Sequence, residues 1–179
     1  MIVMMAGLPG AGKSTLAREL AGRLHGHVLD KDLIRAALFG PDQVEYSATQ
    51  DDFCQELMLQ SASYLLARHP SLDVFLDGRT FSQNEQRECV FAYCRERSVL
   101  FALIECVCAE TTALARIAQS AASGEHPAKN RTPELYREVR GIWKPIGHPK
   151  LVVDTDEPLA LCSDPAIAYL LERRASANS

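Results

Sequence analysis

The sequence predicts a three-layer α/β domain, in which helices cover both faces of a parallel β-sheet. Two observations support this fold class. Short apolar runs alternate along the chain with longer stretches whose apolar residues recur at helical spacing. The length of 179 residues suits one domain with a sizeable core, and no repeat, low-complexity tract or interdomain linker divides residues 1–179. In such a sheet, ligands are expected at the carboxyl ends of the strands.

The individual elements follow from this alternation. The apolar runs predict buried strands at Ile2–Ala6, Val28–Leu29, Val74–Leu76, Leu100–Cys106 and Leu151–Val153. The stretches between and after them predict helices at Ser14–Leu24, Lys31–Leu38, Thr49–Ala67, Asn84–Arg97, Thr111–Ala121, Pro133–Trp143 and Pro165–Arg174. Two helices have start signals of their own. Ser47 followed by Gln50 is a capping-box pattern, and Thr132 before Pro133 fits an N-cap followed by proline.

Composition and charge exclude several classes of protein. The chain is 47% hydrophobic and 23% charged, which is typical of globular proteins. Its formal net charge of -4 and pI near 5.7 argue against a protein that mainly binds nucleic acid backbone. No apolar run reaches the ~18 residues of a membrane span, and Ile2–Ala6 is too short for a signal peptide, so we expect a cytoplasmic protein. The six cysteines form no C-x-x-C pair, which favours reduced structural thiols over a zinc site.

The most specific motif lies between the first predicted strand and the first predicted helix. The segment Gly7-Leu8-Pro9-Gly10-Ala11-Gly12-Lys13-Ser14-Thr15 matches the phosphate-binding pattern G-x-x-x-x-G-K-[ST]. Its glycines let backbone N–H groups turn inward around phosphate oxygens, and the helix start adds its positive dipole end. Lys13 is expected to reach the β- and γ-phosphates, and the Ser14 hydroxyl to bind Mg²⁺. The segment therefore predicts a site for ATP and Mg²⁺ in which every residue from Gly7 to Thr15 takes part.

Acidic and basic residues after the second predicted strand are candidates for an acceptor site. Asp32 follows the strand directly and could orient an acceptor hydroxyl and take its proton, a role that contributes about 10²–10⁴-fold to a rate. Arg35 lies three residues further, so both side chains would share one helix face and bind one substrate. Two alternatives stay open: Asp32 caps the following helix, or Asp30 is the base.

The third predicted strand runs into Asp77-Gly78-Arg79-Thr80. An acidic residue in this position fits the Walker B role, in which Asp77 holds Mg²⁺ through its water shell. Arg79 and Thr80 follow into the same crevice, where they could contact the acceptor or a phosphate. Arg87 lies in the next predicted helix, and for it a solvated surface position is at least as good an expectation.

A polar stretch at residues 120–132 separates two predicted helices and has the composition of a lid. Closure of a lid expels water and brings positive charge onto the transferring phosphoryl group, and we expect Arg116 and Arg131 to supply it. Lys129 is a weaker third candidate, and plain surface solubility is the alternative for all three. By contrast, the segment from Asp30 to Glu56 is acidic, which favours a neutral or cationic acceptor if this segment covers it.

Together these motifs resemble the P-loop kinases related to adenylate kinase, and in particular the group that includes polynucleotide 5′-kinase domains, zeta toxins and chloramphenicol phosphotransferase. The resemblance spans nearly the whole chain, and the P-loop is its most specific part. It implies a P-loop NTPase fold with a five-stranded parallel sheet in the order 2-3-1-4-5, an acceptor-covering helical segment and a small lid.

The resemblance also implies roles for individual residues. Asp32 and Arg35 match an Asp-x-x-Arg pair whose aspartate is the base, and Asp77 matches the aspartate that follows the third strand. Arg116 matches an arginine at the lid base, and residues 126–132 match a lid. The stretch Val153–Asp156 matches the loop beside adenine, which places Thr155 in the cofactor site. Arg79 departs from the small residues that are common in the group.

The sequence thus predicts an ATP-dependent kinase that phosphorylates a hydroxyl of a small molecule. A 5′-hydroxyl polynucleotide or nucleoside kinase is the first alternative, which the acidic composition disfavours. A nucleotide-switched regulatory ATPase with Asp32 as a structural cap is the second. The acceptor and the oligomeric state have no signal in the sequence.

Overall fold

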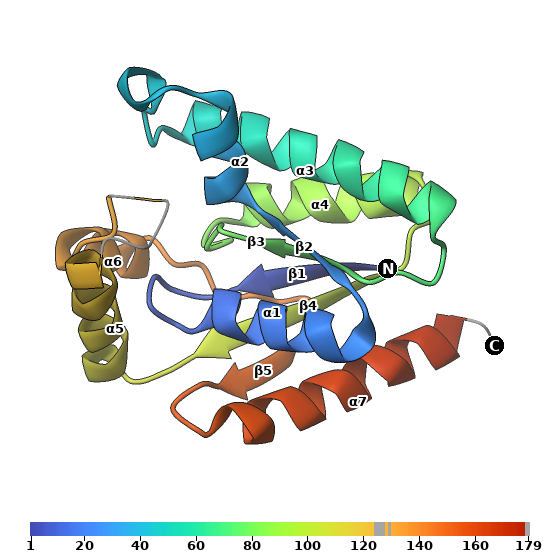
Figure 1. The fold of residues 1–179 in the computed structure, drawn as a ribbon. Helices are drawn as coiled ribbons and strands as arrows, with labels where there is room; N and C mark the ends of the chain where they lie inside the picture. Colours follow the sequence, from blue (N-terminus) through green and yellow to red (C-terminus); the bar gives the residue numbers. More distant parts are fainter. Residues whose placement is uncertain (124–127, 129, 178–179) are drawn as a thin grey trace.

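The protein is an α/β domain built around one parallel sheet, and the computed structural model describes residues 1–123, 128 and 130–177 (Figure 1). The five strands lie in the order β2-β3-β1-β4-β5, as the resemblance implies. Their bounds are β1 Ile2–Ala6, β2 His27–Asp30, β3 Val74–Asp77, β4 Phe101–Val107 and β5 Leu151–Asp154. All neighbouring strands are parallel, so their carboxyl ends meet at one edge of the sheet.

Helices cover both faces of this sheet and form a separate pair at its edge. Their bounds are α1 Lys13–Leu24, α2 Lys31–Leu38, α3 Ala48–Arg68, α4 Asn84–Glu96, α5 Glu110–Ser123, α6 Pro133–Gly141 and α7 Leu159–Ala177, with a short 3₁₀ turn at Pro41–Gln43. In Figure 1, α1 and α7 lie on one side of the sheet and α3 and α4 on the other, while α5 and α6 stand beyond the carboxyl ends of the strands.

Two apolar cores follow from this three-layer arrangement. Alternate residues of β1 serve opposite faces: Val3 and Met5 pack with α1 and α7, whereas Ile2 and Met4 pack with α3 and α4. All five residues of β1 are buried because it is the central strand with helices on both faces. A smaller cluster on α5 and α6 includes Ile117 and Tyr136 and packs against Leu8 of the P-loop.

The two helix start signals that the sequence offered are confirmed. Ser47 caps α3 by accepting a hydrogen bond from the backbone N–H of Gln50 at 3.2 Å, and Thr132 caps α6 by accepting from Leu135 at 3.2 Å. The start of α7 was predicted wrongly. This helix begins at Leu159, and Pro165 lies inside it, because a proline can be accommodated in a helix that is held by its packing.

Arg87 differs from the expected solvated position. It is 2% exposed, and its guanidinium donates to the carbonyl oxygens of Phe81 at 2.7 Å and Lys144 at 3.1 Å. It therefore ties the loop after β3 to the segment that follows α6. These partners are backbone carbonyl groups, and one of them lies 57 positions away along the chain. A local sequence pattern therefore does not predict them.

Residues 124–127 and 129 of the predicted lid, and with them Lys129, lie outside the described residues. In the part of the chain that is described, no helix is long and apolar enough to cross a membrane.

Candidate active site

The loop between β1 and α1 is shaped by three glycines with positive φ. Gly7 has φ 144°, and a Cβ there would lie 2.4 Å from the backbone oxygen of Cys106. Gly10 has φ 79°, and its Cβ would lie 2.5 Å from the backbone oxygen of Ala113. Both positions therefore exclude any side chain, which explains why the phosphate-binding motif requires glycine at the first of them.

The start of α1 leaves its first N–H groups available. Gly12 is the N-cap residue, with φ 77°, and no side chain accepts a hydrogen bond from the helix start. The first N–H groups of a helix have no partner within the helix and carry the positive end of its dipole. An uncapped helix start after a glycine loop therefore has the geometry and the charge that suit a phosphate.

Lys13 is folded back onto the loop. Its ammonium donates to the carbonyl oxygens of Gly7 at 2.8 Å and Leu8 at 2.9 Å. Burial lowers the pKa of Lys13 to about 8, although the Asp77 carboxylate acts in the opposite direction. A phosphate bound in the loop would stabilise the charged lysine and take up the same donors.

Asp77 and Ser14 fit a site for a magnesium ion that is bound together with a nucleotide. Asp77 is 1% exposed, and its Oδ1 has no hydrogen-bond partner. A buried acceptor without a partner is rare in proteins, and a water molecule bound to Mg²⁺ could pair with it. Ser14 lies in the first turn of α1 and lines the cleft. Among the described residues, no group of three or more His, Cys, Asp or Glu side chains could hold a metal. A hydroxyl, a distant carboxylate, water and phosphates are the ligands that suit Mg²⁺ here.

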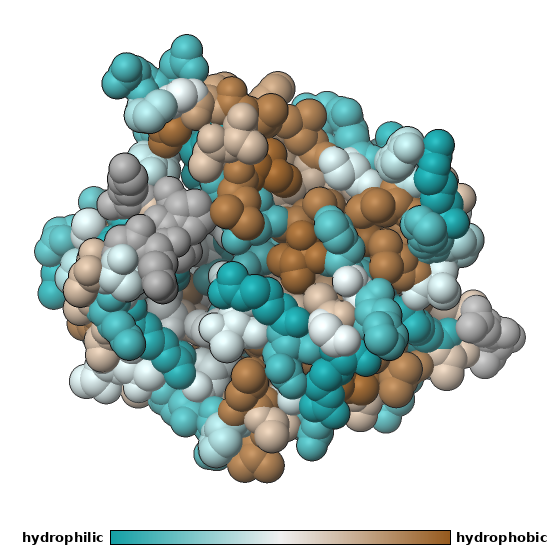
Figure 2. Space-filling view, viewed as in Figure 1, coloured by the Kyte–Doolittle hydropathy of each residue, from teal (hydrophilic) through white to brown (hydrophobic). Residues whose placement is uncertain are grey.

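A cleft of about 450 Å³ lies over the carboxyl edge of the sheet. Its wall comes from the P-loop, α1, α2, the start of α3, the loop after β3 and the α5–α6 side. Seven of its side chains are basic: Lys13, Arg18, Lys31, Arg35, Arg79, Arg116 and Arg131. Figure 2 shows hydrophilic surface in this region, whereas apolar side chains gather over α2 and α3, where Leu33, Leu38 and Phe53 are exposed.

The two aspartates near the start of α2 have different surroundings. Asp30 is the N-cap residue, and its Oδ1 accepts from the backbone N–H groups of Asp32 at 2.8 Å and Leu33 at 3.3 Å. Asp32 is the second residue of the helix and lines the cleft, so it does not cap α2. The capping role that was considered for Asp32 therefore belongs to Asp30.

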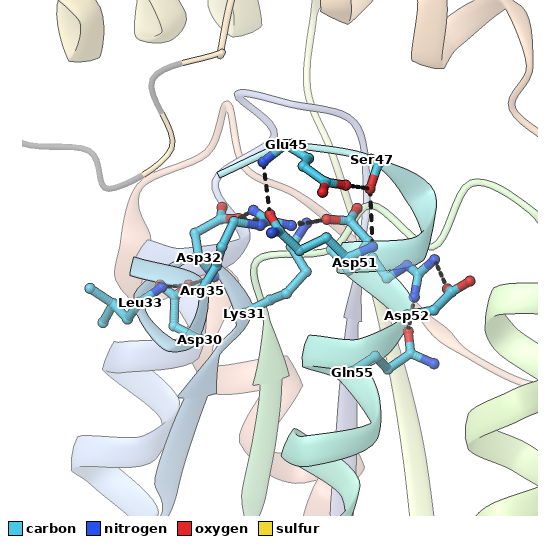
Figure 3. Close-up of polar contacts among 12 residues, drawn as sticks. Asp30, Lys31, Asp32, Leu33, Arg35, Glu45, Ser47, Asp51, Asp52 and Gln55 are labelled. Carbon is cyan, nitrogen blue, oxygen red and sulfur yellow. Dashed lines mark hydrogen bonds and ion pairs between the residues drawn. The ribbon is translucent and has the colours of Figure 1, made fainter. Parts of the chain in front are cut away.

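Asp32 is part of a compact charge network (Figure 3). Its Oδ1 lies 2.7 Å from Nη1 of Arg35 and 3.5 Å from Nζ of Lys31. Asp51, from the first turn of α3, bridges the same two cations: its Oδ1 accepts from Lys31 at 2.7 Å and from Nη2 of Arg35. The Arg35 guanidinium also lies 5.3 Å from the ring centroid of Tyr46. The predicted Asp32–Arg35 pair is thus formed and faces the cleft.

Arg79 and Thr80 also reach the cleft wall. Arg79 is buried, and its guanidinium donates to Gln55 at 2.7 Å and to Asp52 at 2.6 Å, both on α3. The carbonyl oxygen of Thr80 accepts from the N–H of Gly7 at 3.1 Å, which couples the loop after β3 to the P-loop.

The two predicted lid arginines lie in different places. Arg116 donates to the backbone oxygen of Thr155 at 2.7 Å and to that of Gly10 at 3.4 Å, so it joins the P-loop to the loop after β5. Arg131 lines the cleft, and burial lowers its pKa while the carboxylates of Asp32 and Asp77 act against the shift. Arg131 therefore faces the carboxylates of the acceptor side.

Thr155 lies against the back of the P-loop. Its hydroxyl is 3.1 Å from the Ala11 carbonyl oxygen and 3.2 Å from that of Val107, and it meets the space where a Gly12 side chain would be. It is buried and supports the loop from behind.

Sequence reasoning missed three charged residues of the cleft. Arg18 follows Ser14 by four positions, so helical periodicity alone could have placed it beside the P-loop. Lys31 and Asp51 had no such signal, because they meet through the packing of α2 on α3.

Comparisons with known proteins agree with this architecture. A family model described as AAA_33, an AAA domain, matches residues 2–139. No curated protein sequence matches the chain. Among solved structures, a candidate kinase from Chloroflexus aurantiacus J-10-fl is 22% identical, with a TM-score of 0.74 over 96% of this chain and 97% of that one.

Two further structures hold nucleotides. Kti12 from Chaetomium thermophilum in complex with ADP-AlF3 is 12% identical, with a TM-score of 0.73 over 97% of this chain and 98% of that one. The APS kinase CysC from Mycobacterium tuberculosis in complex with AMPPNP and APS is 16% identical, with a TM-score of 0.64 over 97% and 96%. At these identities the likeness shows the fold, which is the P-loop kinase fold.

Proposed function

The chain belongs to the AAA_33 family, and on this premise we propose that it is an ATP-dependent kinase that phosphorylates a hydroxyl of a small molecule. One observation carries the proposal. The uncapped, glycine-shaped phosphate loop and the Asp32 carboxylate line the same cleft, so that a γ-phosphate and an acceptor hydroxyl would meet inside it. The kinases among the solved structures with this fold support the same reaction class.

The chemistry follows from these positions. Phosphoryl transfer needs positioning and charge neutralisation more than covalent help. The N–H groups of the P-loop and Lys13 would hold the phosphates, and Arg131 would add positive charge from the opposite side of the cleft. Ser14, with Asp77 through water, would hold Mg²⁺, which neutralises charge on the β- and γ-phosphates when bound.

Asp32 would act on the acceptor. Lys31 and Arg35 both contact its Oδ1, which fixes the carboxylate and leaves Oδ2 for the acceptor hydroxyl. The hydroxyl oxygen forms the new bond to the γ-phosphorus, the bond to the ADP oxygen breaks, and the proton passes to Asp32. Water must be kept out of the cleft during this step, since it would otherwise compete as the acceptor.

The test is ADP release from MgATP across a panel of sugars, sugar acids, nucleosides, aminoglycosides and a 5′-hydroxyl oligonucleotide. We expect one class to accelerate ADP release, and Asp32→Asn to reduce this acceleration by about 10²–10⁴-fold. Asp42→Asn removes an exposed carboxylate in the turn after α2 and is the matched control, which should behave like wild type.

The outcome separates the alternatives. Acceleration by the oligonucleotide alone would favour a polynucleotide kinase. A slow basal rate that no acceptor changes, with Asp32→Asn equal to wild type, would contradict the kinase and favour a regulatory ATPase.

A further inference from the structure

We propose that the acceptor carries an anionic group, a carboxylate or a phosphate, beside its reacting hydroxyl, and that Arg35 and Lys31 bind this group in the place that Asp51 occupies. The inference rests on the proposed function and names the substrate class of the same site. It comes from three features of the cleft: the burial of the cations, their unused donors and the position of Asp51.

The cations of this wall are more buried than the carboxylate that joins them. Side-chain exposure is 8% for Lys31 and 3% for Arg35, but 26% for Asp51. A buried cation needs an anionic partner, because the removal of each ion from water costs roughly several kcal/mol. Asp51 meets this need from the solvent side of the cations, where a ligand that enters the cleft would also arrive.

Donors in the same wall exceed the acceptors that the protein supplies. Arg35 uses Nη1 on Asp32 and Nη2 on Asp51, while its Nε is buried without a partner. Arg79 likewise uses both terminal nitrogens on α3, and its Nε is buried without a partner. Buried donors are almost always paired in proteins, so two open Nε groups in one cleft wall indicate further acceptor atoms. A carboxylate or phosphate offers these, and it matches the planar geometry of a guanidinium.

Asp51 is placed to give way to such a group. It lies in the first turn of α3, and its side chain lines the cleft. A change of rotamer would release Lys31 and Arg35 together, because one oxygen of Asp51 contacts both. Asp32 keeps its own contact with Nη1 of Arg35, so the base stays fixed while the anion is exchanged.

The charge of the cleft favours a different acceptor from the one that the sequence suggested. The acidic segment Asp30–Glu56 suggested a neutral or cationic acceptor. In the structure, Asp51 and Asp52 are paired with Lys31, Arg35 and Arg79, and Asp30 caps a helix. Among the described residues, the cleft wall holds seven basic side chains and two acidic ones, Asp32 and Asp51. Such a wall attracts anions, including one in addition to the nucleotide.

Matched pairs of acceptors test the substrate class. In each pair the two members share a primary hydroxyl as candidate acceptor and differ in charge: D-gluconate with D-glucose, D-glycerate with glycerol, and a nucleoside 3′-phosphate with its nucleoside. We expect the anionic member of the productive pair to have a kcat/KM at least about 10-fold higher. Asp51→Asn should lower KM for that member several-fold, while Asp42→Asn leaves it unchanged. Higher kcat/KM for neutral members would overturn the inference and leave the kinase intact.

A binding measurement tests the anion site without turnover. With the P-loop filled by saturating Mg-AMPPNP, inorganic sulfate is titrated into the protein by calorimetry. We expect Arg35→Gln to abolish sulfate binding, Asp51→Asn to strengthen it several-fold, and the exposed control Arg95→Gln to match wild type. Circular dichroism melting shows whether each variant folds.

The two measurements together keep the proposals apart. Sulfate binding that is indifferent to both Arg35 and Asp51 would overturn the anion site. If sulfate binding depends on Arg35 but no acceptor accelerates ADP release, the proposed kinase activity is overturned and the anion site is retained.

Discussion

The two halves of the cleft offer different means of binding. On the phosphate side, the groups available to a ligand belong to the backbone: the loop turns at Gly7, Gly10 and Gly12, and α1 starts without a side-chain cap. On the acceptor side, α2 and α3 are both capped by side chains, Asp30 and Ser47, and the wall consists of charged side chains paired with one another. The backbone N–H groups at the start of α1 have no side-chain partner, whereas the charged side chains of the acceptor side are paired with one another.

This difference has a physical consequence. A backbone cradle is fixed by steric exclusion, since a Cβ at Gly10 would meet the backbone of Ala113, and it needs no rearrangement to take a phosphate. A wall of ion pairs can bind a ligand only by exchanging an internal partner for an external one. Specificity is therefore expected to come from the acceptor side, and binding energy common to all nucleotides from the phosphate side.

The first prediction removes the lysine side chain of the phosphate loop. Lys13→Ala should lower kcat by about 10²–10³-fold, the cost of losing a single preorganised donor to the transition state. The fold should survive, because Lys13 donates only to two carbonyl groups of the adjacent loop and belongs to neither apolar core. Steady-state kinetics and circular dichroism measure the two effects. A variant that no longer folds would show that Lys13 belongs to the core.

The phosphate side could be predicted from the sequence more fully than the acceptor side. The P-loop is local: nine consecutive residues fix both its conformation and its ligand, and the alternation of strands and helices around it fixed the fold class. The strand order came from the resemblance, and the sheet confirms it. The Asp32–Arg35 pair was also within reach, since it spans one helical turn.

The rest of the acceptor side depends on contacts between distant segments. Asp51 meets Lys31 from 20 positions away, and Arg79 meets Asp52 from 27 positions away. Arg87 was expected at the surface because arginine usually lies there, but carbonyl groups of two loops surround it. The capping role of Asp30 was missed, although the predicted bounds Lys31–Leu38 are confirmed and place Asp30 directly before the helix.

A pH series tests whether the phosphate side depends on a titrating cation. The pKa of Lys13 is about 8 in the free protein, lowered mainly by burial. Bound phosphate favours the charged form, so MgATP affinity should be constant below pH 8. As the pH rises through the free pKa, it should weaken by up to about 10-fold per unit, with proton uptake on binding.

Two variants assign this pH effect to one lysine. Lys31 also has a pKa of about 8 and lines the same cleft. Lys13→Arg should bind more weakly but without a decline between pH 7 and about 9.5, because arginine stays charged there. Lys31→Arg keeps the charge network and should keep the decline. A decline that disappears in Lys31→Arg would place the titrating group on the acceptor side instead.

The smallest expected effect distinguishes a cap from a base on the acceptor side. Asp30 and Asp77 are neighbours in register at the ends of β2 and β3, and burial together with the Asp77 charge raises the pKa of Asp30. As a cap, Asp30 needs only an acceptor oxygen, which asparagine also has. Asp30→Ala should therefore lower the free energy of unfolding by about 1 kcal/mol, and Asp30→Asn by less, in urea denaturation. Turnover of Asp30→Asn should stay within about threefold of wild type. If instead it falls as far as that of Asp32→Asn, the proton acceptor is Asp30, and Asp32 only positions Arg35 and Lys31.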